Sequence, residues 1–129
     1  MNNSAITILL VDDDAMIRDC MTAYLEDEGF SVYVAATAEE ALELIAAICP
    51  VVCISDLRLP GMDGEEFIGR AHALCPGSGY LLHTGMQYSL SAELRAIGMT
   101  ADDVLLKPIH DLSILVRKIK QIAVDGRNV

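Results

Sequence analysis

The chain has 129 residues, a size that corresponds to one domain with a full hydrophobic core. Apolar residues make up 53% of it and the mean hydropathy is +0.39, which excludes intrinsic disorder. The longest stretch free of Asp, Glu, Lys and Arg, residues 71–92, is interrupted by one proline and three glycines, so no membrane span is expected. The N-terminus lacks a basic segment followed by an apolar run, so no signal peptide is expected either.

Charge is unevenly distributed along the chain. The net charge is −10, and residues 1–64 hold twelve acidic and two basic residues, whereas residues 65–129 hold seven of each. An acidic half repels phosphate backbones, so no direct binding of nucleic acid is predicted, and it attracts a divalent cation. The four cysteines form no CxxC pair and lie in apolar runs, which predicts buried, reduced thiols in a cytoplasmic protein. They are Cys20, Cys49, Cys53 and Cys75.

Five apolar runs have the length of β-strands. In chain order they cover residues 6–11, 31–36, 51–55, 80–84 and 104–106. The first and third are almost wholly apolar, as expected of central parallel strands that are buried on both faces. The second run mixes in polar residues, so we expect it at an edge of the sheet.

Between successive predicted strands, and again after the last one, apolar residues recur with the period of an α-helix. Each of these segments is therefore predicted to be a helix. The first helix carries its apolar stripe from Ile17 to Leu25, and Thr37 and Glu40 form a capping box that opens the second. Apolar residues within 67–74 and 90–97 mark the third helix and a shorter fourth. The last helix has its apolar residues between 112 and 123. Near its end it carries basic residues that suit the negative end of a helix dipole, namely Arg117, Lys118 and Lys120.

Five βα units in series predict one α/β domain. The right-handed crossovers place helices on both faces of a five-stranded parallel sheet. The common open order for five units is 2-1-3-4-5, the doubly wound, flavodoxin-like (βα)5 arrangement, in which ligands bind outside the carboxyl ends of the strands. That rule directs attention to the residues that end each strand.

Acidic and polar side chains stand at those strand ends. They are Asp12, Asp13 and Asp14 after the first strand, then Asp56, Thr84 and Lys107 after the third, fourth and fifth. Clustered carboxylates require a hard cation, and Mg²⁺ fits because it binds oxygen ligands and retains waters. Asp56 can act as a carboxylate nucleophile toward phosphorus, with Thr84 and Lys107 contacting the transferred oxygens. Asp14 fits the N-cap of the following helix equally well.

Four segments of the sequence resemble the signatures of the receiver (CheY-like) domains of bacterial two-component response regulators. They are residues 8–14, 56–64, 83–85 and 101–108, and their order and spacing match over about residues 4–124. The resemblance implies a single receiver domain over residues 1–129, with its core over about 4–124. The second segment also carries the turn residues Pro60-Gly61 and Asp63-Gly64.

The resemblance also implies roles for individual residues. Asp56 is expected to accept a phosphoryl group from a sensor histidine kinase or a histidine phosphotransfer protein, with no multiple-turnover catalysis. Asp13, Asp56 and the backbone carbonyl of Arg58 would bind Mg²⁺ directly, with Asp12 acting through water. Thr84 and Lys107 would bind the phosphoryl oxygens.

The resemblance further predicts a cis peptide bond between Lys107 and Pro108. Phosphorylation is expected to switch the face made by the fourth helix, fifth strand and fifth helix. We expect the protein to be a monomer or a weak, phosphorylation-dependent dimer, and Asp102, Asp103 and Arg117 lie on the face that pairs in one receiver subfamily.

Three positions depart from the family pattern. Val104 replaces the aromatic residue usually found three positions before the strand-end lysine. Arg58 and Met86 occupy the two variable positions that influence loss of the phosphoryl group to water. These departures bear on the output mechanism and on the lifetime of the phosphorylated state, and they leave the predicted phosphorylation chemistry unchanged.

Three alternatives share parts of this pattern. A flavodoxin-like electron carrier would need a phosphate-binding loop after the first strand, where Asp12, Asp13 and Asp14 would repel FMN. A Mg²⁺-dependent phosphatase with an aspartate nucleophile would need a second acid shortly after Asp56, where Leu57 and Arg58 stand instead. A receiver-shaped interaction module would act independently of phosphorylation.

Overall fold

The computed structural model describes residues 6–109 and 111–125 and contains five parallel strands in the order β2-β1-β3-β4-β5. The predicted fold is confirmed. The strands are β1 (Thr7–Val11), β2 (Ser31–Ala35), β3 (Val52–Asp56), β4 (Gly79–Thr84) and β5 (Val104–Leu106). The helices are α1 (Ala15–Asp27), α2 (Ala38–Ile48), α3 (Gly64–Leu74), α4 (Ala92–Ala96) and α5 (Leu112–Asp125), with a 3₁₀ turn, η2 (Ala101–Asp103), before β5.

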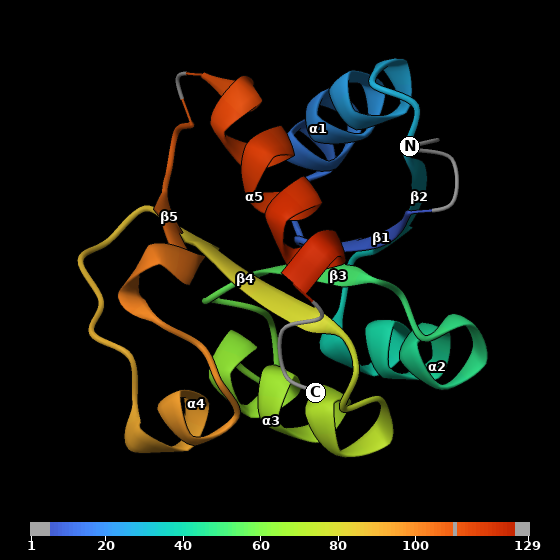
Figure 1. Ribbon diagram of the computed structural model, residues 1–129. Helices are drawn as coiled ribbons and strands as arrows, with labels where there is room; N and C mark the ends of the chain where they lie inside the picture. Colours follow the sequence, from blue (N-terminus) through green and yellow to red (C-terminus); the bar gives the residue numbers. More distant parts are fainter. Residues whose placement is uncertain (1–5, 110, 126–129) are drawn as a thin grey trace.

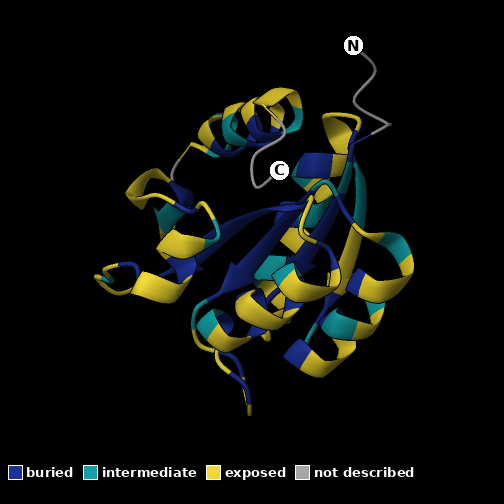
Figure 2. Ribbon diagram, turned by 60° about the horizontal axis from the view of Figure 1, so that its bottom comes forward, coloured by how far each residue is buried: buried dark blue, intermediate teal, exposed yellow. Residues whose placement is uncertain are grey.

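Two helical layers enclose the sheet. Helices α1 and α5 lie on one face, and α2, α3 and α4 lie on the other (Figure 1). Every residue of β3 and β4 is buried, whereas β2 at the edge is half exposed, as predicted from its polar residues. Figure 2 shows the buried strands at the centre and the exposed outer faces of the helices.

Each apolar layer is built from alternate residues of the strands, because successive side chains of a strand point to opposite faces. Leu9 of β1 packs in the layer beneath α2 and α3, around the fully buried Phe67. Its neighbours Ile8 and Leu10 pack in the layer beneath α1 and α5, around Ile119. None of the helices in the described ranges is long and apolar enough to cross a membrane.

The helices begin at residues whose side chains accept backbone hydrogen bonds. Asp14 is the N-cap of α1, and its carboxylate accepts from the N–H groups of Met16 and Ile17 at 2.9 and 3.4 Å. At α2 the Thr37 hydroxyl accepts from the Glu40 N–H at 3.1 Å, as the capping box requires. The return bond differs from the prediction, since the Glu40 carboxylate accepts from the N–H of Ala36 rather than from that of Thr37.

The prediction of four buried, reduced cysteines is wrong in two respects. Cys49 and Cys75 form a disulfide between α2 and α3, and Cys20 is free but exposed on α1; only Cys53 is buried and free. The pairing has no local signature because the two residues are separated by 26 positions. They meet because each follows a helix and precedes one of two neighbouring strands, β3 and β4.

The positions of the basic residues in α5 also differ from the prediction. The helix continues to Asp125, so no basic residue lies in its last turn. Lys118 instead points toward the start of β5, where its ammonium lies 3.6 Å from a carboxylate oxygen of Asp103. Asp103 is fully buried and also accepts from the Thr100 N–H at 2.9 Å, so this carboxylate is not at the surface for pairing between subunits.

Candidate functional site

The carboxyl ends of β1, β3, β4 and β5 bring the predicted site residues to one edge of the sheet. Asp12 follows β1, Asp56 ends β3, Thr84 ends β4 and Lys107 follows β5. The strand registers align these ends, since Asp56 pairs with His83 and Thr84 pairs with Leu106. The site therefore lies where the strand order reverses between β1 and β3, as predicted for this arrangement.

Three carboxylates form the acidic part of the site. One oxygen each from Asp12, Asp13 and Asp56 lie within 4.8 Å of one another. Asp12 and Asp56 are buried, with 1% and 8% of their surface exposed, whereas Asp13 is exposed. Three oxygen donors with one open side match a hard cation that keeps several of its waters, and Mg²⁺ has this preference.

Lys107 connects this cluster to β5. Its ammonium nitrogen lies 3.1 Å from Asp12 Oδ2 and 3.1 Å from Asp56 Oδ2. Burial by itself would lower the pKa of Lys107, but hydrogen bonds to the two carboxylates and their charges outweigh burial and raise it above the usual value. The peptide bond between Lys107 and Pro108 is cis, as predicted. The Lys107 N–H also donates to the Thr84 carbonyl at 2.7 Å, which ties the lysine to the end of β4.

The Asp12 carboxylate and backbone are fixed from the α1 side. Its Oδ1 atom accepts from the Asp14 N–H at 2.9 Å, and its carbonyl accepts from an Arg18 guanidinium nitrogen at 2.7 Å. With Lys107 on the other carboxylate oxygen, Asp12 has partners at both oxygens. Asp14 serves as the helix N-cap, the alternative that the sequence left open.

Thr84 is buried, and its hydroxyl oxygen accepts from the Met86 N–H at 3.3 Å. Across the site, the Arg58 N–H donates to Asp56 Oδ1 at 3.2 Å. The Arg58 side chain donates from Nε to the Met86 sulfur at 3.2 Å. The two variable positions identified in the sequence are therefore in contact. The role of the Arg58 carbonyl as a metal ligand stays a prediction.

The sequence predicted Gly64 only as a turn residue, but the structure gives it a second role. Its N–H donates to the Leu57 carbonyl at 2.8 Å, so the first turn of α3 lies directly against the end of β3. A Cβ at this position would collide with the backbone carbonyl of Asp56. Only glycine permits this approach, which positions the loop that follows Asp56.

His83 was not predicted as a site residue, although it lines the same pocket as Lys107. It is buried, and neither ring nitrogen has a hydrogen-bond partner within the described residues. Burial, together with the Lys107 charge, lowers the pKa of His83 to about 4. It lines a pocket of about 300 Å³ between α1 and α5, beside Met21 and Leu112. A lone histidine in an apolar strand carries no sequence signal for this position.

A second hollow lies beside Val104. It has a volume of about 500 Å³ and is lined by Val104, Leu106 and residues 87–89 of the loop between β4 and α4. The hydroxyl of Tyr88 in this loop donates to the Glu65 carboxylate of α3. The small side chain at position 104 therefore leaves open space on the α4–β5–α5 face.

Comparison with known proteins agrees with this geometry. The family model described as "Response regulator receiver domain" matches residues 8–120. The receiver domain (CheY-like) of Methanospirillum hungatei has 36% sequence identity and a TM-score of 0.82, covering 94% of this chain and 95% of that one. The beryllofluoride-activated NtrC4 receiver domain dimer has 29% identity and a TM-score of 0.79, with 93% and 98% coverage.

Curated relatives differ in length. An "Uncharacterized 14.6 kDa protein in sodA1 3'region" of Leptolyngbya boryana is 38% identical over 115 residues, which are 88% of this chain and 87% of that protein. The transcriptional regulatory protein DctD of Rhizobium meliloti is 37% identical over 106 residues, 82% of this chain but 23% of DctD. The chain spans 33% of a protein-glutamate methylesterase/protein-glutamine glutaminase of Rhodopseudomonas palustris. With the acidic cluster and lysine at the carboxyl edge of a 2-1-3-4-5 sheet, these matches establish that the chain belongs to the response-regulator receiver domain family.

Proposed function

We propose that this protein is a phosphoacceptor of a two-component signalling system and that Asp56 carries the phosphoryl group. The observation that carries the proposal is the pair of 3.1 Å contacts from the Lys107 ammonium to Asp12 and Asp56. These contacts bring together an ammonium group, a nucleophile and a second acid that follow or end three separate strands. The core of this single receiver domain would extend over about residues 4–124.

Asp56 is suited to act as the nucleophile. A carboxylate oxygen forms a bond to phosphorus as the bond from phosphorus to the donor's histidine nitrogen breaks, which yields an acyl phosphate. The partly buried Lys107 ammonium stands beside the attacking oxygens and can bind a phosphoryl oxygen by a charge-assisted hydrogen bond. The Thr84 hydroxyl, fixed at the end of the neighbouring strand, can donate its proton to another phosphoryl oxygen.

The acidic cluster fits Mg²⁺, with Asp13, Asp56 and the Arg58 carbonyl as direct ligands and Asp12 acting through water. When bound, the cation would neutralise negative charge on the phosphoryl oxygens and on the carboxylates around them. The exposed carboxylate of Asp13 forms the outer wall of the cluster, and the buried Asp12 forms the inner one. Asp13 therefore lies where an incoming phosphoryl donor would approach.

The donor is a sensor histidine kinase or a histidine phosphotransfer protein, as in the family at large. The chain would act as a substrate of that donor and would hydrolyse its own acyl phosphate, without multiple turnover on other substrates. Its response is a change in the face formed by α4, β5 and α5. A cytoplasmic location and a monomer or weak dimer stay predictions.

Incubation of the chain with acetyl phosphate and Mg²⁺, followed by intact-mass spectrometry, tests this proposal. We expect one phosphoryl adduct on the wild-type chain, no adduct on Asp56→Asn and none in EDTA. Asp63→Asn is a matched control, because Asp63 caps α3 through a 2.8 Å bond to the Glu66 N–H, away from the acidic cluster. An equal adduct on Asp56→Asn would contradict the proposal, and multiple turnover of a phosphomonoester would identify a phosphatase instead.

A further inference from the structure

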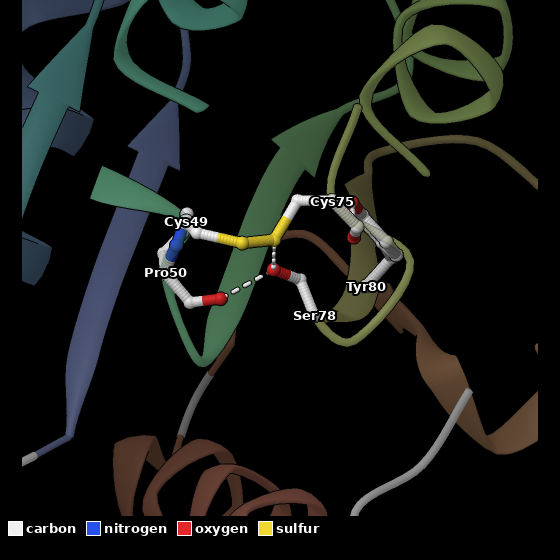
Figure 3. The surroundings of a disulfide bond; sticks show 5 residues. All are labelled: Cys49, Pro50, Cys75, Ser78 and Tyr80. Atoms are coloured by element: carbon white, nitrogen blue, oxygen red, sulfur yellow. Dashed lines mark hydrogen bonds between the residues drawn. A yellow bond between two sulfur atoms is a disulfide. The ribbon is translucent and has the colours of Figure 1, made fainter. Parts of the chain in front are cut away.

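Figure 3 shows the disulfide between Cys49 and Cys75 with the residues around it. Cys49 and Cys75 precede β3 and β4, so the disulfide lies at the opposite end of these strands from Asp56 and Thr84. Cys49 is the C-cap of α2 and Cys75 is the C-cap of α3. Their Cα atoms are 5.8 Å apart, within the usual range for a disulfide. The pairing of β3 with β4 sets this distance, since the Gly79 N–H donates to the Val51 carbonyl at 2.9 Å just beyond the two cysteines.

The two cysteines differ in exposure. Cys49 is exposed and has a left-handed backbone with φ of 45°, whereas Cys75 is buried with 3% of its surface exposed. A reagent in solution therefore reaches Cys49 first, and Cys75 stands behind it. One accessible thiol with a second, buried thiol beside it is the arrangement needed for thiol–disulfide exchange through a mixed disulfide.

Ser78 provides a hydrogen-bonding environment for both redox states of Cys75. Its buried hydroxyl donates to the Pro50 carbonyl and lies 3.3 Å from the Cys75 sulfur. A hydroxyl has one proton but two lone pairs. With its proton directed to Pro50, the Ser78 oxygen can accept the S–H proton of a reduced Cys75. The Tyr80 hydroxyl donates to the Cys75 carbonyl at 3.2 Å and holds the backbone in either state.

Backbone hydrogen bonds hold the two helix ends beside the disulfide. The Cys49 N–H donates to the Ile45 carbonyl at 3.0 Å, and the Cys75 N–H donates to the Ala71 carbonyl at 2.8 Å, so both helix ends are closed by backbone hydrogen bonds. Each face of the sheet also carries a cluster of buried hydrophobic side chains, and Cys75 is one member of the cluster beneath α2 and α3. Reduction would therefore release the link between α2 and α3 without removing the structure on either side.

We propose that Cys49 and Cys75 form a reversible redox pair that exchanges with low-molecular-weight thiols and disulfides of the glutathione type. In oxidation, the Cys49 thiolate attacks one sulfur of the small disulfide, whose S–S bond breaks and releases one thiolate. The Cys75 thiol then loses its proton and attacks the Cys49 sulfur, which releases the second thiolate. The protein gives up two electrons and two protons, and the small disulfide becomes two thiols; excess thiol reverses both steps.

The other two cysteines cannot replace this pair. Cys53 is fully buried in β3, and burial raises the pKa of its thiol, which keeps it protonated and unreactive. Cys20 is exposed on α1, on the other face of the sheet from α2 and α3. A Cys20→Ser background therefore removes intermolecular disulfides while it leaves the proposed pair intact.

The test is a redox titration of the folded Cys20→Ser chain in mixtures of reduced and oxidised glutathione. Free thiols are alkylated in denaturant after the titration and counted by intact-mass spectrometry. We expect three alkylated thiols in the reduced chain (Cys49, Cys53 and Cys75) and one, Cys53, in the oxidised chain, with a melting temperature about 10 °C higher in the oxidised form. A bond that persists in excess reduced glutathione while the chain stays folded, or thiols that stay reduced in excess oxidised glutathione, would overturn the proposal.

Single substitutions distinguish the accessible cysteine, Cys49, from the buried one, Cys75. In Cys75→Ser, the exposed Cys49 is expected to accumulate as a mixed disulfide with glutathione, whereas in Cys49→Ser the buried Cys75 is expected to stay unmodified. Equal glutathione labelling of both single variants would count against this assignment.

Discussion

The Lys107 ammonium joins two carboxylates that lie 95 and 51 positions earlier in the chain. At 3.1 Å from each, it partly offsets the repulsion among the clustered acids. Removal of either partner would leave an uncompensated charge in a partly buried site. The residues of the acidic cluster are therefore interdependent, and their substitutions should not be additive.

At the same residue scale, the contact between Arg58 and Met86 predicts a long-lived phosphorylated state. Hydrolysis requires a water aligned with the phosphorus–oxygen bond by a hydrogen-bond acceptor, which the Arg58 guanidinium cannot provide and the Met86 sulfur provides only weakly. We expect the double substitution Arg58→Asn and Met86→Glu to shorten the lifetime roughly tenfold, which corresponds to about 1.4 kcal/mol in the barrier. Decay of the phosphorylated mass after removal of acetyl phosphate measures this rate.

Met86→Leu is the matched control for this prediction, because it keeps the size of the side chain and adds no acceptor. We expect its lifetime to equal that of the wild type. A double variant that decays no faster than the wild type would show that these two positions do not control hydrolysis here.

His83 predicts a pH dependence of stability. The pKa of this buried side chain is about 4 in the folded chain, below the value of about 6.5 expected when unfolded. As pH falls below about 6.5, the unfolded state therefore binds the proton first, and stability falls progressively until pH reaches about 4. Between pH 7 and pH 5 the loss due to His83 is about 1–2 kcal/mol. Urea unfolding of wild type and His83→Leu at both pH values measures the difference, and an unchanged pH dependence in His83→Leu would refute it.

At the scale of elements, the α4–β5–α5 face combines a small side chain with a buried ion pair. Val104 is β-branched and stiff about its first side-chain torsion, so it cannot fill the hollow beside it as an aromatic ring would. Asp103, which precedes it, is held by Lys118 of α5 and by the Thr100 N–H. These contacts fasten the start of β5 to α5, while the Tyr88 loop remains tied to α3 through Glu65.

This arrangement predicts weak coupling between phosphorylation and the α4–β5–α5 face, at or below about 1 kcal/mol. Sedimentation of the wild type with and without beryllofluoride, a phosphoryl mimic, should show an incomplete shift toward dimer at micromolar concentration. Val104→Tyr supplies the missing ring and is expected to enlarge the shift. A complete shift to dimer in the wild type would mean that Val104 does not limit the response.

At the scale of the whole molecule, the acidic cluster and the disulfide occupy opposite ends of the same strands. Cys49 and Cys75 precede β3 and β4, whereas Asp56 and Thr84 end them. Five residues of β3 place about 13 Å between its first and last Cα atoms, so the two sites share no direct contact. Perturbations at such separations usually add independently.

We therefore expect acetyl phosphate to label Asp56 to the same yield, within about twofold, in the oxidised and reduced forms of the chain. Intact-mass spectrometry after labelling at two fixed ratios of reduced to oxidised glutathione provides the measurement. A labelling yield that follows the redox state would show that strain or motion passes along β3 and β4.

Local patterns in the sequence determined the fold class and most of the site. Buried apolar runs of strand length, alternating with helical periods, predicted all five strands to within one residue at each end, because hydrophobic periodicity directly records which faces are buried. The strand-end positions of Asp12, Asp56, Thr84 and Lys107 followed from the same reasoning, since parallel strands in the order 2-1-3-4-5 bring their carboxyl ends to one edge.

Only the tertiary structure decided the features that depend on distances between separate elements. The pairing of Cys49 with Cys75, the collision that would follow any side chain at Gly64, and the burial of Asp103 beside Lys118 all arise where distant segments meet. A cysteine, a turn glycine and an aspartate have the same local signature whether or not another element approaches them. Their roles are set by how the helices pack on the sheet, and that packing depends on the whole chain.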